Sequence, residues 1–109
     1  MTQLATLKCE ACNNLTPRVE SDDLERLRAD LDPAWVVEDG LRLHREFKFK
    51  TFNAAFTRAT SVALLAEDQG HHPDMHVGWG YLIVELTTHA IKGLSQNDFI
   101  MAAKIDKQG

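Results

Sequence analysis

The hydrophobic period of the sequence changes once between residues 50 and 52, and this change limits the folds that the chain can adopt. From Leu41 to Lys50, apolar and polar side chains alternate, which is the pattern of a β-strand with one buried face. From residue 52 to residue 69, apolar side chains recur every three or four positions, as on one side of an α-helix, and this stripe consists of Phe52, Ala55, Phe56, Ala59, Val62, Ala63 and Ala66. A strand that leads directly into an amphipathic helix is typical of folds in which a helix covers a sheet.

We expect a hairpin before this helix. Its strands are Trp35 to Val37 and Leu41 to Lys50, because Asp39-Gly40 supplies the positive φ angles that a tight turn needs. One face of the second strand is apolar, with Arg45 as the exception, and consists of Leu41, Leu43, Phe47 and Phe49. The other face is charged, and we expect it to meet water or a partner.

The remaining elements complete an alternating order. Ser21 can cap a helix that Asp32-Pro33 ends, and Gly70 is a natural stop for the helix of residues 52–69. Two more strands, Met75 to Trp79 and Tyr81 to Thr88, precede a last helix from about Ser95 to about Lys107. Side chains alternate in the second of these strands, with Leu82, Val84 and Leu86 on one face. The order α-β-β-α-β-β-α predicts a single α+β domain, with a small antiparallel sheet and helices packed on one face.

Length and charge narrow the function classes. The chain has 109 residues and a net charge of -4, which disfavours direct binding to nucleic acid. It has no apolar run near the roughly 20 residues of a membrane span, and its N-terminus lacks the basic start of a signal peptide. We therefore expect a cytoplasmic protein with a domain over residues 18–109. Residues 1–17 are expected to form an N-terminal arm outside the core.

This arm contains the motif Cys9-Glu10-Ala11-Cys12, which allows three interpretations. It can be half of a zinc site, which needs two more ligands, or a redox pair, which needs a preceding strand and a following helix. It can also be two reduced thiols on a mobile segment, as is usual in the cytosol. We favour the third, because a loop-like sequence follows the motif.

Three of the five histidines lie at the ends of expected elements, namely His71, His72 and His89. Imidazole titrates near neutral pH, so paired histidines can donate and accept protons without a cofactor. His71 and His72 are adjacent and should point in different directions, and His89 can converge with one of them on a cleft. A zinc-protease pattern of His72 and His76 fails, because Pro73 replaces the required Glu.

Two acidic residues accompany these histidines. Ser95 and Asp98 match a capping box at the start of the last helix, which is a purely structural explanation for both. The Asp98 carboxylate could also orient His89 or bind a substrate nitrogen. Glu67 lies in the last turn before Gly70, near the mouth of any cleft there. We interpret His44 and His76 as solvent-facing strand residues and expect no catalytic metal.

Over residues 20–107 the chain resembles the pterin-4a-carbinolamine dehydratase family. The resemblance rests on an acidic residue, three spacers, His-His-Pro, an aromatic residue, Thr-His and a later Asp. Trp35, the strand Phe47-Lys48-Phe49 and the helix start Phe52-Asn53-Ala54-Ala55-Phe56 also resemble the family. In this chain the motif reads Glu67, His71-His72-Pro73, Trp79 and Tyr81, Thr88-His89 and Asp98. The resemblance implies the dehydration of 4a-hydroxytetrahydropterin to quinonoid dihydropterin, which recycles tetrahydrobiopterin for an aromatic amino-acid hydroxylase.

The resemblance also assigns roles to residues. His71 and His89 become the acid/base candidates and His72 supports them. The expected pterin-lining residues are Pro73, Thr88, Ala90 and Ile91, with Asp98, Glu67 and Trp35 at the edge. The family implies a homodimer or homotetramer and requires no metal, nucleotide or flavin. Two alternatives are a dimerisation cofactor for a transcription factor and a protein that binds pterin without turnover.

Overall fold

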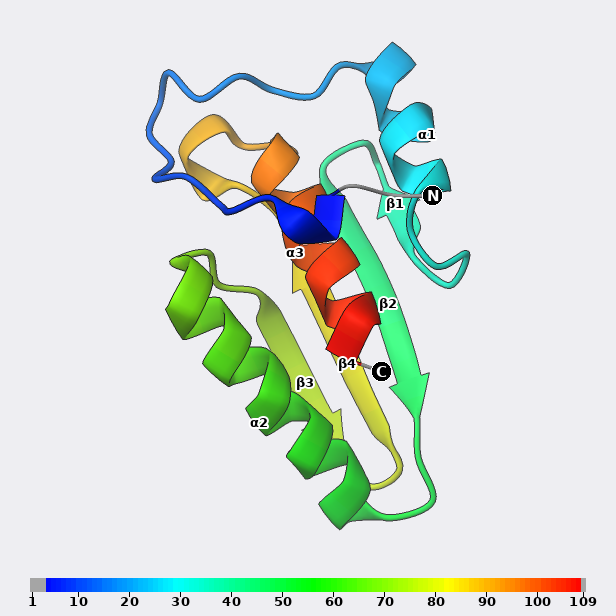
Figure 1. Cartoon of the computed structure of the whole chain (residues 1–109). Coiled ribbons are helices and arrows are strands. Elements are labelled where there is room, and N and C mark those ends of the chain that lie inside the picture. Colours follow the sequence, from blue (N-terminus) through cyan, green and yellow to red (C-terminus); the bar gives the residue numbers. More distant parts are fainter. Residues whose placement is uncertain (1–3, 109) are drawn as a thin grey trace.

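The computed structural model describes residues 4–108, and an antiparallel sheet with α-helices on one face makes up this part of the chain (Figure 1). The elements are the short 3-10 helix η1 (Leu4–Thr6), α1 (Ser21–Ala29), β1 (Val36–Glu38), β2 (Arg42–Lys48), α2 (Phe52–Gln69), β3 (Asp74–Gly78), β4 (Tyr81–Leu86), the 3-10 helix η2 (His89–Ile91) and α3 (Gln96–Gln108). The predicted α+β class and the order α-β-β-α-β-β-α are confirmed. Within residues 4–108, every helix is too short or too polar to cross a bilayer.

The sheet has the strand order β1-β2-β4-β3, and all of its neighbouring strands are antiparallel. Asp39 and Gly40 have φ angles of 55° and 68°, so the β1–β2 turn uses the left-handed conformations that the sequence predicted. Helix α2 packs against β3 and β4, and α3 packs against β4 and α2. Both helices therefore cover the same face of the sheet, and the opposite face stays open in the chain (Figure 1).

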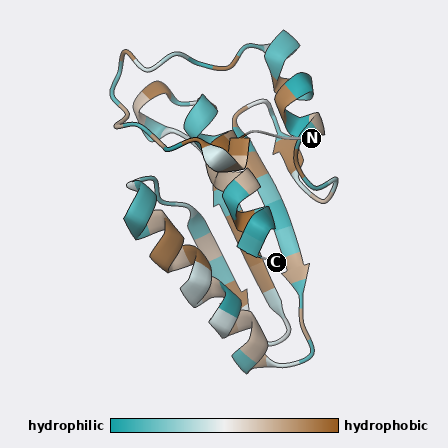
Figure 2. Cartoon of the chain, in the orientation of Figure 1, coloured by the Kyte–Doolittle hydropathy of each residue, from teal (hydrophilic) through white to brown (hydrophobic). Residues whose placement is uncertain are grey.

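The core lies between this sheet face and the helices. Every second residue of β4 is fully buried, as the alternating pattern predicted, namely Leu82, Val84 and Leu86. Helix α2 contributes a stripe of small buried side chains, namely Ala55, Ala59, Val62 and Ala66. Figure 2 shows the resulting bands of polar and apolar residues along β2, β4 and α2. Small residues on α2 let this helix approach the sheet closely.

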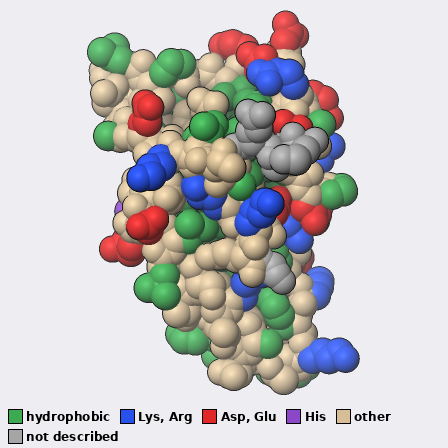
Figure 3. Space-filling view, in the orientation of Figure 1, with side chains coloured by type: hydrophobic (Ala, Val, Ile, Leu, Met, Phe, Trp, Pro, Cys, Tyr) green, Lys and Arg blue, Asp and Glu red, His purple; other side chains and the backbone are tan. Residues whose placement is uncertain are grey.

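Part of the predicted apolar stripe of α2 does not reach the core. Phe52 and Phe56 are 48% and 54% exposed, and their rings stack on each other at 6.1 Å between centroids. Ala63 is exposed as well. Hydrophobic side chains are visible at the surface on the α2 side of the molecule (Figure 3). The helical period was therefore correct, but the buried face is narrower than the stripe.

The N-terminal segment packs against the domain more closely than we expected. Leu4 is buried in the core, and Cys9 packs against its edge. Lys104 of α3 donates a hydrogen bond to the Ala5 carbonyl at 2.9 Å. The expectation that residues 1–17 lie outside the core is thus wrong for Leu4, because α3 offers an apolar surface on which η1 packs. Residues 1–3 lie outside the described residues.

Arg45, the exception on the apolar face of β2, is held there by Asp106 of α3. Its guanidinium lies 2.7 Å from the Asp106 carboxylate and sits over the Phe47 ring at 4.2 Å. The same Asp106 oxygen accepts the indole N–H of Trp35 at 2.8 Å. A charged pair under a helix is tolerated because its hydrogen bonds replace those to water.

We expect Asp106→Ala to lower the free energy of unfolding by about 2–3 kcal/mol, since hydrogen bonds to a half-buried charged group are lost. Urea denaturation followed by circular dichroism measures this loss. Asp23→Ala is the matched control, because Asp23 pairs with Arg26 at the surface and should cost below about 1 kcal/mol. Equal losses in the two variants would contradict this account of Arg45.

Candidate active site

A buried histidine and a buried aspartate form the centre of the candidate site. Helix α2 ends at Gly70, whose φ of 68° turns the chain sharply, and His71 follows directly. The His71 Nε2 atom lies 2.6 Å from Oδ1 of Asp98, which sits in the first turn of α3. His71 is 8% exposed and Asp98 is fully buried, so the pair is shielded from bulk water.

The second oxygen of Asp98 is fully occupied. Its Oδ2 accepts the Thr88 hydroxyl at 2.8 Å and the backbone N–H of Ser95 at 2.9 Å. Because the Thr88 proton points to Asp98, the Ser95 hydroxyl is left to donate to Thr88 Oγ1 at 2.7 Å. One of the two hydrogen bonds of the predicted capping box is therefore present, in which the Asp98 carboxylate accepts the Ser95 backbone N–H. The other is replaced, because the Ser95 hydroxyl bonds to Thr88.

These contacts determine what His71 can do chemically. An ionised carboxylate only accepts hydrogen bonds, so Asp98 places a proton on His71 Nε2. The other ring nitrogen, Nδ1, is then the one that can accept or release a proton toward a substrate. A carboxylate that fixes an imidazole in this way is a familiar arrangement for general acid/base catalysis.

His72 points away from this pair, as expected for adjacent residues in an extended turn. Its Nε2 lies 2.5 Å from Glu67 Oε2, and both side chains are exposed. Glu67 lies in the last turn of α2, and its carboxylate extends toward the His72 ring. Pro73 is half-buried between His72 and the start of β3. The structure therefore gives each of the two adjacent histidines its own carboxylate.

His89 is the third histidine predicted for the site. It is exposed at the start of η2, next to Ala90 and Ile91. His89 lines a small hollow of about 240 Å³ together with Leu41, Arg42, Thr87 and Lys92. The connection from His71 to His89 runs through Asp98 and Thr88, and Thr88 directly precedes His89 in the sequence.

Trp35 is not at the edge of this pair. It is 1% exposed and donates its indole N–H to Asp106. Asp106 lies eight positions after Asp98 on α3, which corresponds to about 12 Å along the helix axis. The Trp35 side chain belongs to the core beneath the C-terminal part of α3, and its place at the edge of a pterin site stays a prediction.

The N-terminal segment forms hydrogen bonds with the two segments next to His71 and Asp98, namely the end of α2 and the start of α3. The Cys9 N–H donates to Gln69 Oε1 at 3.0 Å, two residues before His71. The Glu10 N–H donates to Asn97 Oδ1 at 3.0 Å, directly before Asp98, and Asn97 Nδ2 donates to the Glu10 carbonyl at 2.6 Å. No periodic signal in the sequence indicates these contacts, since they join a loop to two helix ends.

A larger hollow of about 790 Å³ opens beside this segment. It lies between the N-terminal segment, α1 and the start of α3, and it reaches Ser95, Gln96 and Asn97. Its charged lining residues are of both signs, namely Lys8, Glu10, Arg18, Asp23 and Arg26. The Arg18 guanidinium also donates to the carbonyl of Ile91 in η2. The hollow thus borders the backbone that carries Asp98.

Cys9 is an unreactive thiol in this setting. Its pKa is raised to about 11, chiefly by burial; the charge of Lys104 lowers the pKa, and Asp98 and Cys12 add smaller increases. Both cysteines are free. Within residues 4–108, only Glu38, His44 and Glu85 gather as possible metal ligands, so the cysteines find no third ligand there. The packed segment agrees with reduced thiols but not with a mobile arm.

Comparison with known proteins gives a consistent result. The family model described as pterin 4 alpha carbinolamine dehydratase matches residues 17–108. A relative from Alkaliphilus metalliredigens, named "Putative pterin-4-alpha-carbinolamine dehydratase", is 45% identical over 99% of this chain and 97% of its own length. A relative of the same name from Rickettsia canadensis is 39% identical, over 99% of each chain.

Two solved structures are similar in fold. A transcriptional coactivator/pterin dehydratase from Brucella melitensis has a TM-score of 0.77 and 33% identity, over 84% of this chain and 97% of that one. A pterin dehydratase-like protein identified as a RuBisCO assembly factor of the alpha-carboxysome has a TM-score of 0.58 and 21% identity. The match to it covers 68% of this chain and 87% of that one, and it shows the fold alone.

We expect the single thiol of Cys12→Ser to react with iodoacetamide at a rate that rises about tenfold per pH unit up to about pH 11. The reason is that only the thiolate reacts, and burial raises the Cys9 pKa to about 11. The same variant in denaturant is the control, where the rate should level off near pH 8.5. Identical pH profiles for folded and unfolded protein would contradict the buried position of Cys9.

Proposed function

The chain belongs to the pterin 4 alpha carbinolamine dehydratase family, and from this premise we propose that it dehydrates a 4a-hydroxytetrahydropterin to the quinonoid dihydropterin. The observation that carries the proposal is the buried pair of His71 and Asp98, which holds one imidazole in a fixed orientation. The proposed substrate is of the tetrahydrobiopterin type, and the reaction would recycle the cofactor of an aromatic amino-acid hydroxylase.

The proposed reaction needs two proton transfers. In the substrate, a hydroxyl group and a ring nitrogen share one carbon. The nitrogen lone pair forms a carbon–nitrogen double bond as the carbon–oxygen bond breaks, an acid protonates the leaving hydroxyl to water, and a base takes the ring N–H proton. His71 Nδ1 would carry one of these transfers, because Asp98 occupies Nε2. Each such group typically contributes about 10²–10⁴-fold to the rate.

His89 is our candidate for the second transfer and His72 for support. His89 is exposed and sits one residue after Thr88, whose hydroxyl is bound to Asp98. The pterin would lie against the loop from Pro73 and against η2, with Ala90 and Ile91. Thr88 itself would act by holding Asp98, since Asp98 and Ser95 already occupy its hydroxyl. Glu67 would orient His72.

Protein binding without catalysis is a second candidate function. The exposed side of α2 carries Phe52, Phe56 and Leu64, which are 48%, 54% and 68% exposed. An apolar stripe of this kind fits a second copy of the chain or another protein. A homodimer or homotetramer is our proposal for the enzyme, in a cytoplasmic setting. A non-catalytic module would use the same surface and would not depend on His71.

We expect His71→Ala and His89→Ala each to lower the rate of dehydration by about 10²–10⁴-fold, with a smaller loss for His72→Ala. Asp98→Asn should lower the rate of dehydration at least roughly tenfold, because the amide no longer fixes the proton on Nε2 of His71. The measurement is the decay of freshly generated 4a-hydroxytetrahydropterin, followed by ultraviolet absorbance and compared with the spontaneous rate.

The matched control for Asp98→Asn is Asp30→Asn, an exposed carboxylate after α1 that should leave the rate unchanged. Circular dichroism establishes that each variant is folded. A folded wild-type protein that does not exceed the spontaneous rate would overturn the dehydratase and favour the binding module. Full activity in folded His71→Ala would leave a dehydratase but would remove the buried pair from its mechanism.

A further inference from the structure

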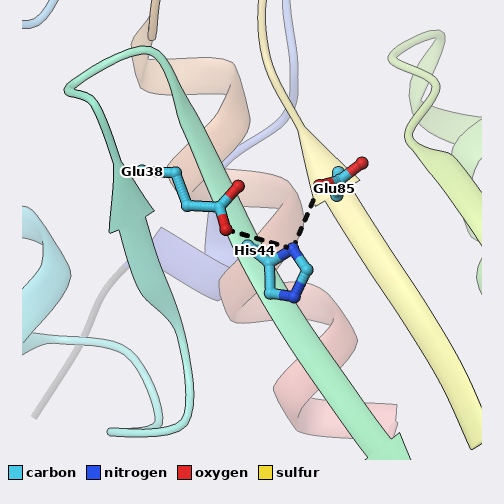
Figure 4. Close-up of side chains that lie close together, drawn as sticks. All are labelled: Glu38, His44 and Glu85. Carbon is cyan, nitrogen blue, oxygen red and sulfur yellow. Dashed lines mark hydrogen bonds and ion pairs between the residues drawn. The ribbon is translucent and has the colours of Figure 1, made fainter.

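A second group of ionisable side chains lies on the open face of the sheet, opposite the helices. It consists of Glu38 at the end of β1, His44 of β2 and Glu85 of β4, which converge from three strands (Figure 4). His44 and Glu85 are direct cross-strand partners, and Glu38 lies diagonally across from His44. The group is separate from His71 and Asp98 in sequence and in sheet face.

The three side chains bring one possible ligand atom each close together. His44 Nδ1 lies 3.0 Å from Glu85 Oε2 and 3.6 Å from Glu38 Oε2, and all three atoms lie within 4.8 Å of one another. A tetrahedral zinc ion with bonds of about 2.0–2.1 Å separates its ligands by about 3.3–3.4 Å. The two contacts of His44 fall on either side of that value.

From this geometry we propose that Glu38, His44 and Glu85 form a binding site for a zinc-class divalent cation. A single N–H on Nδ1 points well at only one oxygen, whereas two carboxylate oxygens face this nitrogen. A dication binds all three lone pairs at once and balances the two negative charges. An imidazole ligand favours Zn²⁺ or Co²⁺ over Mg²⁺ and Ca²⁺, which take oxygen ligands.

Each carboxylate also has a nitrogen neighbour outside the group. The other oxygen of Glu38 lies 3.7 Å from an Arg42 nitrogen, and that of Glu85 lies 3.8 Å from His76 Nε2. These contacts are too long for hydrogen bonds, so they leave the carboxylate oxygens able to bind a cation. All three side chains are only partly exposed, at 36%, 27% and 25% for Glu38, His44 and Glu85. Three protein ligands leave a fourth position for water.

A cation bound at this site would stabilise the pairing of the strands. Within residues 4–108, the edge strand β1, which has three residues, pairs only with β2. Because the site joins β1 to β2 and β4, a bound cation adds a link across three strands, and binding to the folded state alone raises the melting temperature. The site is therefore a structural clamp rather than part of the proposed dehydration.

Isothermal titration with ZnCl₂ tests the proposal in a Cys9→Ser/Cys12→Ser background, which removes thiolate ligands. We expect one Zn²⁺ per chain, a rise in melting temperature, and affinity losses of at least about tenfold in Glu38→Gln, His44→Gln and Glu85→Gln. Glu46→Gln, which removes a charge from the same face of β2, should change the affinity by less than about twofold.

His72→Gln is the control for imidazole, because His72 pairs with a single carboxylate, Glu67. Absence of stoichiometric binding, or equal losses in His72→Gln or Glu46→Gln, would overturn the proposal and leave His44 as an ion-pair partner only. If the Cys9→Ser/Cys12→Ser variant does not fold, the absorption spectrum of wild-type protein with Co²⁺ tests the proposal instead. Cobalt bands without a thiolate charge-transfer band support the site, and cobalt bound entirely through thiolate contradicts it.

Discussion

Full burial of the Asp98 carboxylate is the constraint on which the arrangement of this domain depends. A buried charge is costly unless hydrogen bonds replace its water, so each partner of Asp98 must be in place when the chain folds. His71 follows α2, Thr88 follows β4, and Ser95 precedes α3, and all three bond to the one carboxylate. The three segments that meet at the candidate site are thus joined by a single side chain, and the orientation of His71 is a consequence of that packing.

Much of the fold could be predicted from hydrophobic period and turn chemistry. The alternation in β2 and β4 placed Leu43 and Leu82 in the core, and Gly70 marked the end of α2 at the residue where the structure ends it. The width of the buried stripe on α2 could not be predicted, because Phe52 and Phe56 are apolar whether or not a partner element covers them. Nor could the position of Leu4, since docking of η1 on α3 depends on tertiary contacts that leave no period in the sequence.

The residues of the candidate site could be predicted from the sequence, but the hydrogen bonds between them could not. His71, Thr88 and Asp98 were recognised from their residue types and from the family resemblance, and the structure brings these three together. The sequence suggested that Asp98 could orient His89, whereas it binds His71, because α3 begins beside the end of α2. The bond between Trp35 and Asp106 could not be predicted either, because it joins the start of the hairpin to the last helix and no period in the sequence indicates it.

The two faces of the sheet separate two kinds of ionisable groups. On the helix face, Asp98 is fully buried and satisfied by three partners, which suits a site where one proton must have a defined position. On the open face, Glu38 and Glu85 converge on His44 with oxygens that a single proton cannot satisfy equally. The first arrangement is complete within the chain, whereas the second gains most from a further positive charge. The helix side of the sheet is therefore suited to proton transfer and the open face to cation binding, because α2 and α3 bring His71 and Asp98 to one side while the strands present Glu38, His44 and Glu85 on the other.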